Sequence, residues 1–492
     1  MAFGNVVAEG YVTNADERLW RAASAASLLF AAALCAAPLR GHSDAIDPHT
    51  YTVLARHMAE SGRWLDPSYL PSIFHHFREH LPFGIWPWAL AVRLLGEGAL
   101  VPLALTFSLG TLVIMLVVGA RVFGRSAALL GVLVLSSTDS FFQTAGQVRL
   151  DNLLLLLTTA TTLPLWEPVS IPTARWAFAA AMASLAVLVK GPFGLLPLVA
   201  TTVARAFTLR SPREILFGGL AAGAALLPAV LFLAHDALLA DGTWWRGYVL
   251  DQLYASARGL RNDSEQGFVP LKSLAGRFWP GLPLSLWGIA IGLRDLMRRR
   301  ATPVSMVAVH TLAGFALLFL PARKLPHHNL VMYPALALLA GAAAAPVARR
   351  LIASLPRRRA AVIALIALAA ATTVASVAGV GAFLTSRFCV IPPRLGASLP
   401  RGADVLVVAP EYDWRALAAL AAEYDLNGWP VRTVSAGVAL EGAPGSALVN
   451  PGRPVPLALV RADVPPGSHG GWQRRAQDGR WTLWARDPRA FP

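Results

Sequence analysis

Long apolar runs separated by short polar segments make up most of this 492-residue chain. A helix needs roughly 20 apolar residues to cross a bilayer, and runs near that length recur along the sequence. They cover residues 19–39, 99–120, 126–142, 152–166, 175–189, 191–207, 214–233, 279–297, 303–320, 328–345 and 360–384. The pattern predicts a polytopic α-helical membrane protein with about 11–13 spans.

The apolar segment 81–95 differs from these runs, because it contains Pro82 and Pro87 and carries Arg93 near its end. We interpret it as a juxtamembrane or re-entrant helix at the outer interface, with Trp86 and Trp88 at the level of the lipid headgroups. The alternative is a true span whose effect on topology is cancelled by one span fewer elsewhere.

Basic residues predict the orientation of the chain. If the N-terminus lies in the cytoplasm, alternation of the spans places five basic clusters on that same side, as the positive-inside rule requires. They are Arg121 with Arg125, Arg175, Arg205 with Arg210 and Arg213, residues 298–300, and residues 349–359. The net charge of +15 is explained in this way, so nucleic acid is not expected as a partner.

The composition changes after residue 388, where proline, glycine, arginine and aspartate become frequent and the apolar runs stop. Short apolar stretches at 404–409, 430–434 and 457–460 predict strands, and 414–424 predicts an amphipathic helix. We therefore expect a membrane domain over residues 1–388, whose first outer loop covers 40–97. A small α/β extramembrane domain over 389–492 would follow it.

The first outer loop holds the carboxylates Asp44 and Asp47 directly after the first span. Such a carboxylate can act as a general base, bind an acceptor hydroxyl or amine, or hold a divalent ion. It can also simply cap a helix, since Asp47 precedes Pro48. Both aspartates are candidate catalytic residues, and Asp47 is the stronger one.

The same loop ends in a cluster of titratable groups that includes His76, Arg78, Glu79 and His80. Cationic and titratable side chains at a membrane surface suit a phosphate or pyrophosphate group. A polar flank that orients the following helix is the alternative. Metal binding is a weaker interpretation, because adjacent histidines lack the i, i+4 spacing of a helical ligand pair.

Three later outer turns carry further candidates for binding a phosphate or another part of a substrate. Arg149 and Asp151 could form a structural ion pair, and Asp151 also suits the N-terminus of the helix that follows. Lys190 ends an apolar helix, where its ammonium could reach outward into water or face a lipid phosphate. Lys324 and His327 belong to a basic turn suited to an anionic headgroup.

The order of these motifs resembles that of the GT-C glycosyltransferases of the protein O-mannosyltransferase and lipid A aminoarabinose transferase type. The resemblance covers residues 15–345 and is made by the set of motifs, each of them weak alone. They are Asp-Pro-His-Thr-Tyr at 47–51, Ser-Gly-Arg-Trp-Leu at 61–65, Arg-Leu-Asp at 149–151, Leu-Val-Lys-Gly-Pro at 188–192, Lys-Leu-Pro at 324–326 and Tyr-Pro-Ala-Leu-Ala-Leu-Leu-Ala at 333–340.

The resemblance implies transfer of a sugar from a polyprenyl-phosphate donor to a lipid, glycan or protein acceptor. The reaction would take place on the periplasmic face of a bacterial inner membrane. Asp47 occupies the place of the family's catalytic aspartate, and Lys190, Lys324 and residues 76–80 occupy places near the donor phosphate. Two positions depart from the pattern: Pro48 stands where the family often has glutamate, and His80 where it often has lysine.

Two other classes of protein stay open on the residues alone. Many spans and basic outer turns also suit a lipid or sugar transporter or flippase, although such proteins often show internal repeats and polar residues at mid-membrane depth. Pro48 leaves room for a non-catalytic subunit of the same fold. No cofactor is required by the residues, and a divalent cation stays open.

Overall fold

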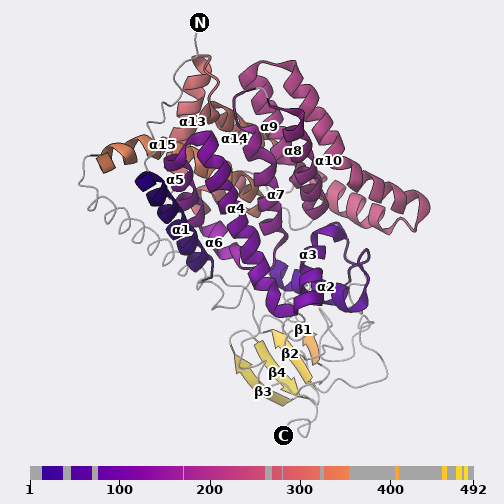
Figure 1. The fold of residues 1–492 in the computed structure, drawn as a ribbon. Coiled ribbons are helices and arrows are strands. Elements are labelled where there is room, and N and C mark those ends of the chain that lie inside the picture. The colour runs from indigo at the N-terminus through magenta and orange to yellow at the C-terminus, as the bar shows by residue number, and fades with distance from the viewer. Residues whose placement is uncertain are drawn as a thin grey trace. The chain divides into compact units, whose positions relative to one another are not determined.

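The computed structural model describes residues 14–36, 46–68, 76–169, 171–260, 269–279, 281–321, 326–353, 405–408, 457–461, 473–478 and 481–485. The chain divides into two compact units (Figure 1). The helical unit comprises Met1–Pro38, Leu105–Gly146 and Asp151–Val380. The loop unit comprises Leu39–Ala104, Gln147–Leu150 and Gly381–Pro492.

Helices joined by short turns build almost all of the described part of the helical unit. Two of them begin just outside it, because α4 and α7 start within segments of the loop unit. The helices are α1 (Asn14–Ala36), α4 (Leu100–Phe123), α5 (Arg125–Ser136), α6 (Asp139–Ala145), α7 (Leu150–Thr162), η4 (Leu163–Leu165), α8 (Thr173–Lys190), α9 (Pro192–Leu209), α10 (Pro212–Leu239), η5 (Trp245–Tyr254, a π-helix), α11 (Ala255–Arg258), α12 (Val269–Arg277), α13 (Gly281–Met297), α14 (Pro303–Leu318), η6 (Pro326–Met332) and α15 (Tyr333–Ala353).

The apolar runs from 19–39 to 328–345 all contain helices, as the sequence predicts. Five helices in the described part of the chain are long and apolar enough to cross a membrane. They are Glu97–Phe123, Thr173–Lys190, Pro192–Leu209, Pro212–Leu239 and His327–Arg350. Three shorter apolar helices accompany them, so the number of spans stays a prediction. The expected run 360–384 lies outside the described residues.

One expected span is not a single helix. The run 126–142 forms α5 and α6, which meet at an angle of 71° and together are either one broken span or a re-entrant loop. At the break, Ser137 and Thr138 donate their side-chain hydroxyls to carbonyl oxygens of α5, with Ser137 Oγ 2.8 Å from Leu133 O. Side chains that bond to the preceding turn in this way often bend a helix.

The helices of the helical unit pack in a continuous series. Helices α8, α9 and α10 contact one another, α9 packs on α14, α14 on α13, α13 on α15, and α15 on α5 (Figure 1). Glycines permit the closest approaches, since a Cβ atom on Gly341 would lie 2.2 Å from Ala127 O, and one on Gly288 would lie 2.5 Å from Leu339 O. Small residues at such contacts are typical of helices that associate within membranes.

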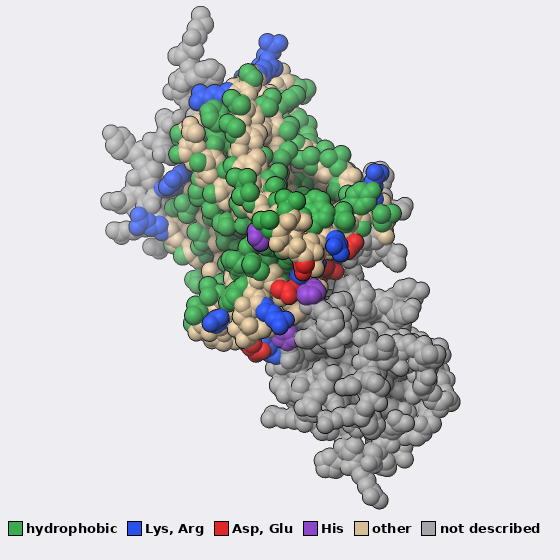
Figure 2. All heavy atoms as spheres, turned by 90° about the vertical axis from the view of Figure 1, so that its right-hand side faces the viewer, with side chains coloured by type: hydrophobic (Ala, Val, Ile, Leu, Met, Phe, Trp, Pro, Cys, Tyr) green, Lys and Arg blue, Asp and Glu red, His purple; other side chains and the backbone are tan. Residues whose placement is uncertain are grey.

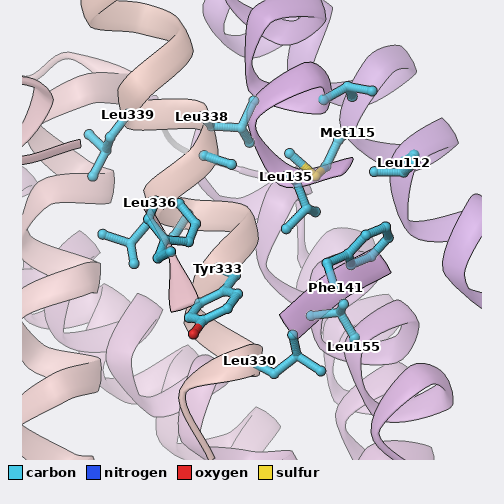
Figure 3. Packing of buried hydrophobic residues seen from close by; sticks show 14 of the residues in the cluster. Leu112, Met115, Leu135, Phe141, Leu155, Leu330, Tyr333, Leu336, Leu338 and Leu339 are labelled. Carbon is cyan, nitrogen blue, oxygen red and sulfur yellow. The ribbon is translucent and has the colours of Figure 1, made fainter. Parts of the chain in front are cut away.

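A hydrophobic cluster fills the space between α15 and the helices α4 to α7. From α15 it receives Tyr333, Leu336, Leu338 and Leu339, all buried (Figure 3). From the opposite side come Leu112 and Met115 of α4, Leu135 of α5, Phe141 of α6 and Leu155 of α7. Burial of this apolar surface and its close packing hold the helices together.

The outer surface of the helical unit is apolar as well. Hydrophobic side chains cover most of the face shown in Figure 2. On α10 the exposed face carries large residues that are each more than half exposed, namely Ile215, Leu216, Leu220, Leu227, Val230, Leu231, Leu238 and Leu239. A soluble protein rarely exposes so large an apolar patch, whereas contact with lipid tails accounts for it.

A buried arginine ties α9 to its neighbours. Arg205 is fully buried, its Nε lies 2.5 Å from Glu214 Oε2 of α10, and its guanidinium donates to the carbonyl oxygens of Leu165, Glu167 and Val169. The sequence counts this arginine in a basic cluster on the cytoplasmic side, and its burial leaves that orientation a prediction. Burial of this charged side chain is tolerated because each of its three guanidinium nitrogens donates a hydrogen bond.

The described helices of the loop unit are α2 (Ile46–Ser61), η2 (Pro82–Gly84), α3 (Trp86–Leu95) and η3 (Glu97–Ala99). With ten residues, α3 is too short to cross a bilayer, which supports the interpretation of 81–95 as a helix that does not span. Trp86 is 36% exposed, whereas Trp88 is fully buried within the protein. The position of both side chains at the level of the lipid headgroups stays a prediction.

Four strands complete the described part of the loop unit: β1 (Val405–Val408), β2 (Leu457–Arg461), β3 (Gln473–Asp478) and β4 (Trp481–Ala485). They form one sheet in the order β1-β2-β4-β3, in which β1 and β2 are parallel and the other pairs antiparallel. Strands β1 and β2 lie where the sequence predicts strands. The expected helix 414–424 and strand 430–434 lie outside the described residues, so the α/β domain over 389–492 stays a prediction.

We expect Gly341→Ala to destabilise the helical unit, because its new Cβ would collide with the backbone of α5. Overpacking of this kind costs about 1–3 kcal/mol of the free energy of unfolding. Gly223→Ala on the exposed face of α10 is the matched control, since its Cβ would meet open space. Thermal unfolding of the purified protein in detergent measures both, and equal melting temperatures for the two variants would contradict this packing.

Candidate functional site

A buried ion pair joins two helix ends in the helical unit. Lys190, the last residue of α8, places Nζ 2.6 Å from Oδ1 of Asp151 in the first turn of α7. The two side chains are only 7% and 5% exposed. Each charge suits its helix end, since a carboxylate is favourable at an N-terminus and an ammonium at a C-terminus. Lys190 is therefore not the freely exposed lysine that one interpretation of the sequence expected.

The turn after Lys190 depends on a glycine. Gly191 has φ +61° and ψ −141°, a conformation that other residues rarely adopt, and Pro192 then begins α9. A Cβ at Gly191 would lie 2.0 Å from the Tyr248 Oη atom of η5. On the other helix of the turn, the rings of Phe193 and His328 lie 4.1 Å apart. Residues from η5 and η6 thus converge on the segment that follows the buried lysine.

Tyr248 and His327 flank this turn region. Burial raises the pKa of the Tyr248 phenol, so its hydroxyl is uncharged at neutral pH. His327, a predicted phosphate ligand, is half-buried and lies 4.9 Å from the His328 ring. The predicted ligand Lys324 lies outside the described residues.

In the loop unit, Asp47 lies in the first turn of α2, where the sequence predicts a helix start. Its Oδ2 atom is 3.7 Å from Nη2 of Arg149, which is too long for a strong hydrogen bond. No partner for the buried Nε of Arg149 lies among the described residues. The carboxylate of Asp47 is 40% exposed and so remains accessible to a substrate. Asp44 lies outside the described residues.

The cluster at the end of the first loop is held by Asp66, which the sequence did not single out as a ligand. Its Oδ1 atom accepts a hydrogen bond from Arg78 Nη2 at 2.7 Å and lies 2.8 Å from His76 Nδ1. Partial burial raises the pKa of Asp66, but these hydrogen bonds and charges outweigh it and hold the pKa below its usual value. The carboxylate thus stabilises the folded loop above its ordinary pKa, and this contribution is lost as the pH falls through the lowered value.

Several other described titratable groups of this loop are engaged in packing or pairing. Glu79 and His80 are half-buried, and the His80 ring lies 6.1 Å from the Tyr51 ring and 6.2 Å from the Phe77 ring. Arg56 of α2 forms an ion pair with Glu97 of η3. The structure therefore brings His76 and Arg78 together through Asp66 and places His80 against aromatic rings.

A metal centre has no obvious place in the described residues, which contain no group of three or more histidine, cysteine, aspartate or glutamate side chains that could hold a metal ion. The residues that the sequence failed to single out are Tyr248, Asp66 and the Arg56–Glu97 pair. Asp66 lies ten residues from His76, and no short motif connects the two. Tyr248 belongs to a π-helix, for which the hydrophobic pattern carries no signal.

No protein-family model matches the chain, and no curated protein matches it by sequence. Solved structures do match. ArnT from Cupriavidus metallidurans bound to undecaprenyl phosphate has a TM-score of 0.61 at 19% identity, over 96% of this chain and 98% of that one. The apo state of the same protein has a TM-score of 0.62 at 18% identity, over 97% and 100% of the two chains.

A second protein with this fold is the archaeal oligosaccharyltransferase AglB from Archaeoglobus fulgidus, in complex with an inhibitory peptide and a dolichol-phosphate. Its TM-score is 0.53 at 14% identity, and the match covers 97% of this chain and 75% of that one. Identities this low establish the fold and nothing finer. The chain has the fold of ArnT and AglB, which confirms the GT-C fold that the sequence motifs predicted.

Proposed function

We propose that this protein is a glycosyltransferase that takes a sugar from a polyprenyl-phosphate-linked donor. The observation that carries the proposal is the shared fold, because solved structures of both ArnT and AglB hold a polyprenyl phosphate. A fold alone does not determine an activity. The proposal therefore also rests on residues of this chain that suit two tasks of such an enzyme, namely binding of the donor phosphate and activation of the acceptor.

The first task is binding of the lipid phosphate, which we assign to Lys190. Its ammonium is fixed at a helix end, in surroundings that exclude most water. An ammonium held in a poorly hydrated place attracts a phosphate oxygen more strongly than one in bulk water. The pair with Asp151 keeps the ammonium in place before the lipid arrives. Among the other predicted phosphate ligands, His327 and the paired residues His76 and Arg78 stay secondary candidates.

The second task is activation of the acceptor, which we assign to Asp47. The carboxylate would take the proton from an acceptor hydroxyl or amine as the acceptor atom bonds to the anomeric carbon of the sugar. The bond from that carbon to the phosphate oxygen breaks, and polyprenyl phosphate leaves with the bonding electrons. Attack from the side opposite the phosphate would invert the anomeric carbon. Positive charge near the leaving phosphate stabilises it as it departs.

Location in a bacterial inner membrane, with the reaction on the periplasmic face, belongs to the same proposal. It rests on the apolar face of the helical unit and on the distribution of arginines along the sequence. The acceptor can be a lipid, a glycan or a protein. A transporter or flippase of the same lipid would bind the donor without forming a new glycosidic bond, so the product separates the two functions.

We expect Asp47→Asn to abolish most of the sugar transfer, because an amide cannot accept the acceptor proton. General base catalysis contributes about 10²–10⁴-fold to rate, and a loss in that range is the predicted result. The assay follows labelled sugar from a polyprenyl-phosphate donor into acceptor in membranes that contain the protein. Glu60→Gln is the matched control, because Glu60 lies on the same helix α2 with an exposed side chain. Full activity in folded Asp47→Asn would remove Asp47 as the base.

We expect Lys190→Met to lose binding of undecaprenyl phosphate and also to destabilise the protein, because Asp151 would stay buried without its partner. Breaking a buried pair costs about 3–5 kcal/mol. The double variant Asp151→Asn/Lys190→Met removes both charges, so its thermal stability should recover while lipid binding stays lost. If the double variant binds the lipid as tightly as the wild type, the pair is only structural.

A further inference from the structure

The π-helical segment η5 follows α10 and contains Tyr248, whose side chain is buried in the helical unit. Its start is fixed on α10, because Trp245 N donates to Asp236 Oδ2 at 2.9 Å and the Trp244 ring lies 5.6 Å from the Phe232 ring. Tyr248 is only 3% exposed. Long π-helical segments are rare and often occur at functional sites.

The hydroxyl of Tyr248 occupies the space that a side chain at residue 191 would fill. A Cβ built on Gly191 would lie 2.0 Å from Tyr248 Oη and 3.3 Å from its Cζ atom. Gly191 also has φ +61°, so glycine is required there by its backbone as well as by the contact. The phenol therefore touches the chain at the one residue that separates α8 from α9.

Lys190 is bonded to this glycine and forms the last residue of α8. The backbone N–H of Gly191 donates to Val187 O at 2.7 Å, which closes the helix end. A shift of Gly191 towards an empty Tyr248 position would change the direction in which the Lys190 side chain leaves the helix. Asp151 holds the tip of that side chain, and the end of α8 together with the turn sets where its base lies.

We propose that Tyr248 is a positioning residue for Lys190: its hydroxyl, packed on Gly191, fixes the turn that orients the ammonium towards the phosphate of the lipid donor. The inference rests on the proposed function, since it takes Lys190 as the phosphate ligand. Its consequence is specific. Loss of Tyr248 should weaken the part of lipid binding that comes from the phosphate and leave the part that comes from the isoprenoid chain.

The experiment compares the dissociation constants of undecaprenyl phosphate and undecaprenol, an alcohol with the same chain. The dissociation constant of undecaprenol divided by that of undecaprenyl phosphate measures how much the phosphate contributes to binding. The attraction between an ammonium and a phosphate in a poorly hydrated place weakens steeply with distance, so Tyr248→Ala should lower this ratio at least about tenfold. Binding of undecaprenol should stay within about twofold of the wild type. Tyr254→Ala is the matched control, because Tyr254 lies in the same segment and is 52% exposed.

A second pair of variants separates positioning from a general loss of structure. Gly191→Ala should lower the ratio in the presence of Tyr248, because the new Cβ collides with its hydroxyl. In the Tyr248→Ala background the collision is absent and only the strain at φ +61° remains, so the same change should lower the ratio by a clearly smaller factor than it does in the wild type. Fully additive effects would overturn the proposal.

The outcomes also separate this inference from the proposed function. If the wild type binds the phosphate and the alcohol equally, Lys190 is not a phosphate ligand and both fail. If the wild type prefers the phosphate and Tyr248→Ala keeps that preference, only the role of Tyr248 is refuted. A fall in binding of both lipids by the same factor would mean that Tyr248 is merely structural, and would also refute the inference.

Discussion

The ion pair between Asp151 and Lys190 is the interaction on which the candidate donor site depends. Two charges withdrawn from water are costly unless they meet each other with good geometry and further support. Here the ends of α7 and α8 add favourable helix dipoles to the 2.6 Å contact. The pair lies at helix ends, so the position of the ammonium depends on the turn through Gly191, against which Tyr248 packs.

The helices were predictable because the cost of unpaired backbone groups in lipid makes long apolar runs helical. Several candidate site residues could also be picked out, since a charge next to an apolar run is conspicuous. Their partners were not. Lys190 and Asp151 are 39 residues apart, and Asp66 reaches His76 across ten, separations over which sequence spacing carries no contact information. The burial of Trp88 likewise depends on packing within the loop unit, which the sequence pattern does not specify.

The polar residues that the sequence singled out in the first loop differ in the structure: some are paired with one another, and one carboxylate remains accessible. Asp66 pairs with both His76 and Arg78, and Arg56 pairs with Glu97, so much of this charge stabilises the loop itself. Asp47 differs, because its 3.7 Å contact with Arg149 is loose and its carboxylate is well exposed. A carboxylate that is oriented but not saturated suits a base that must receive a proton.

The central claim is that Lys190 receives the phosphate of a polyprenyl lipid. The most direct measurement is an experimental structure of the protein in a lipid nanodisc with undecaprenyl phosphate. We expect a phosphate oxygen about 2.7–2.9 Å from Lys190 Nζ, the distance of a charge-assisted hydrogen bond. A lipid phosphate bound away from Lys190, with the ammonium still paired to Asp151 alone, would contradict it.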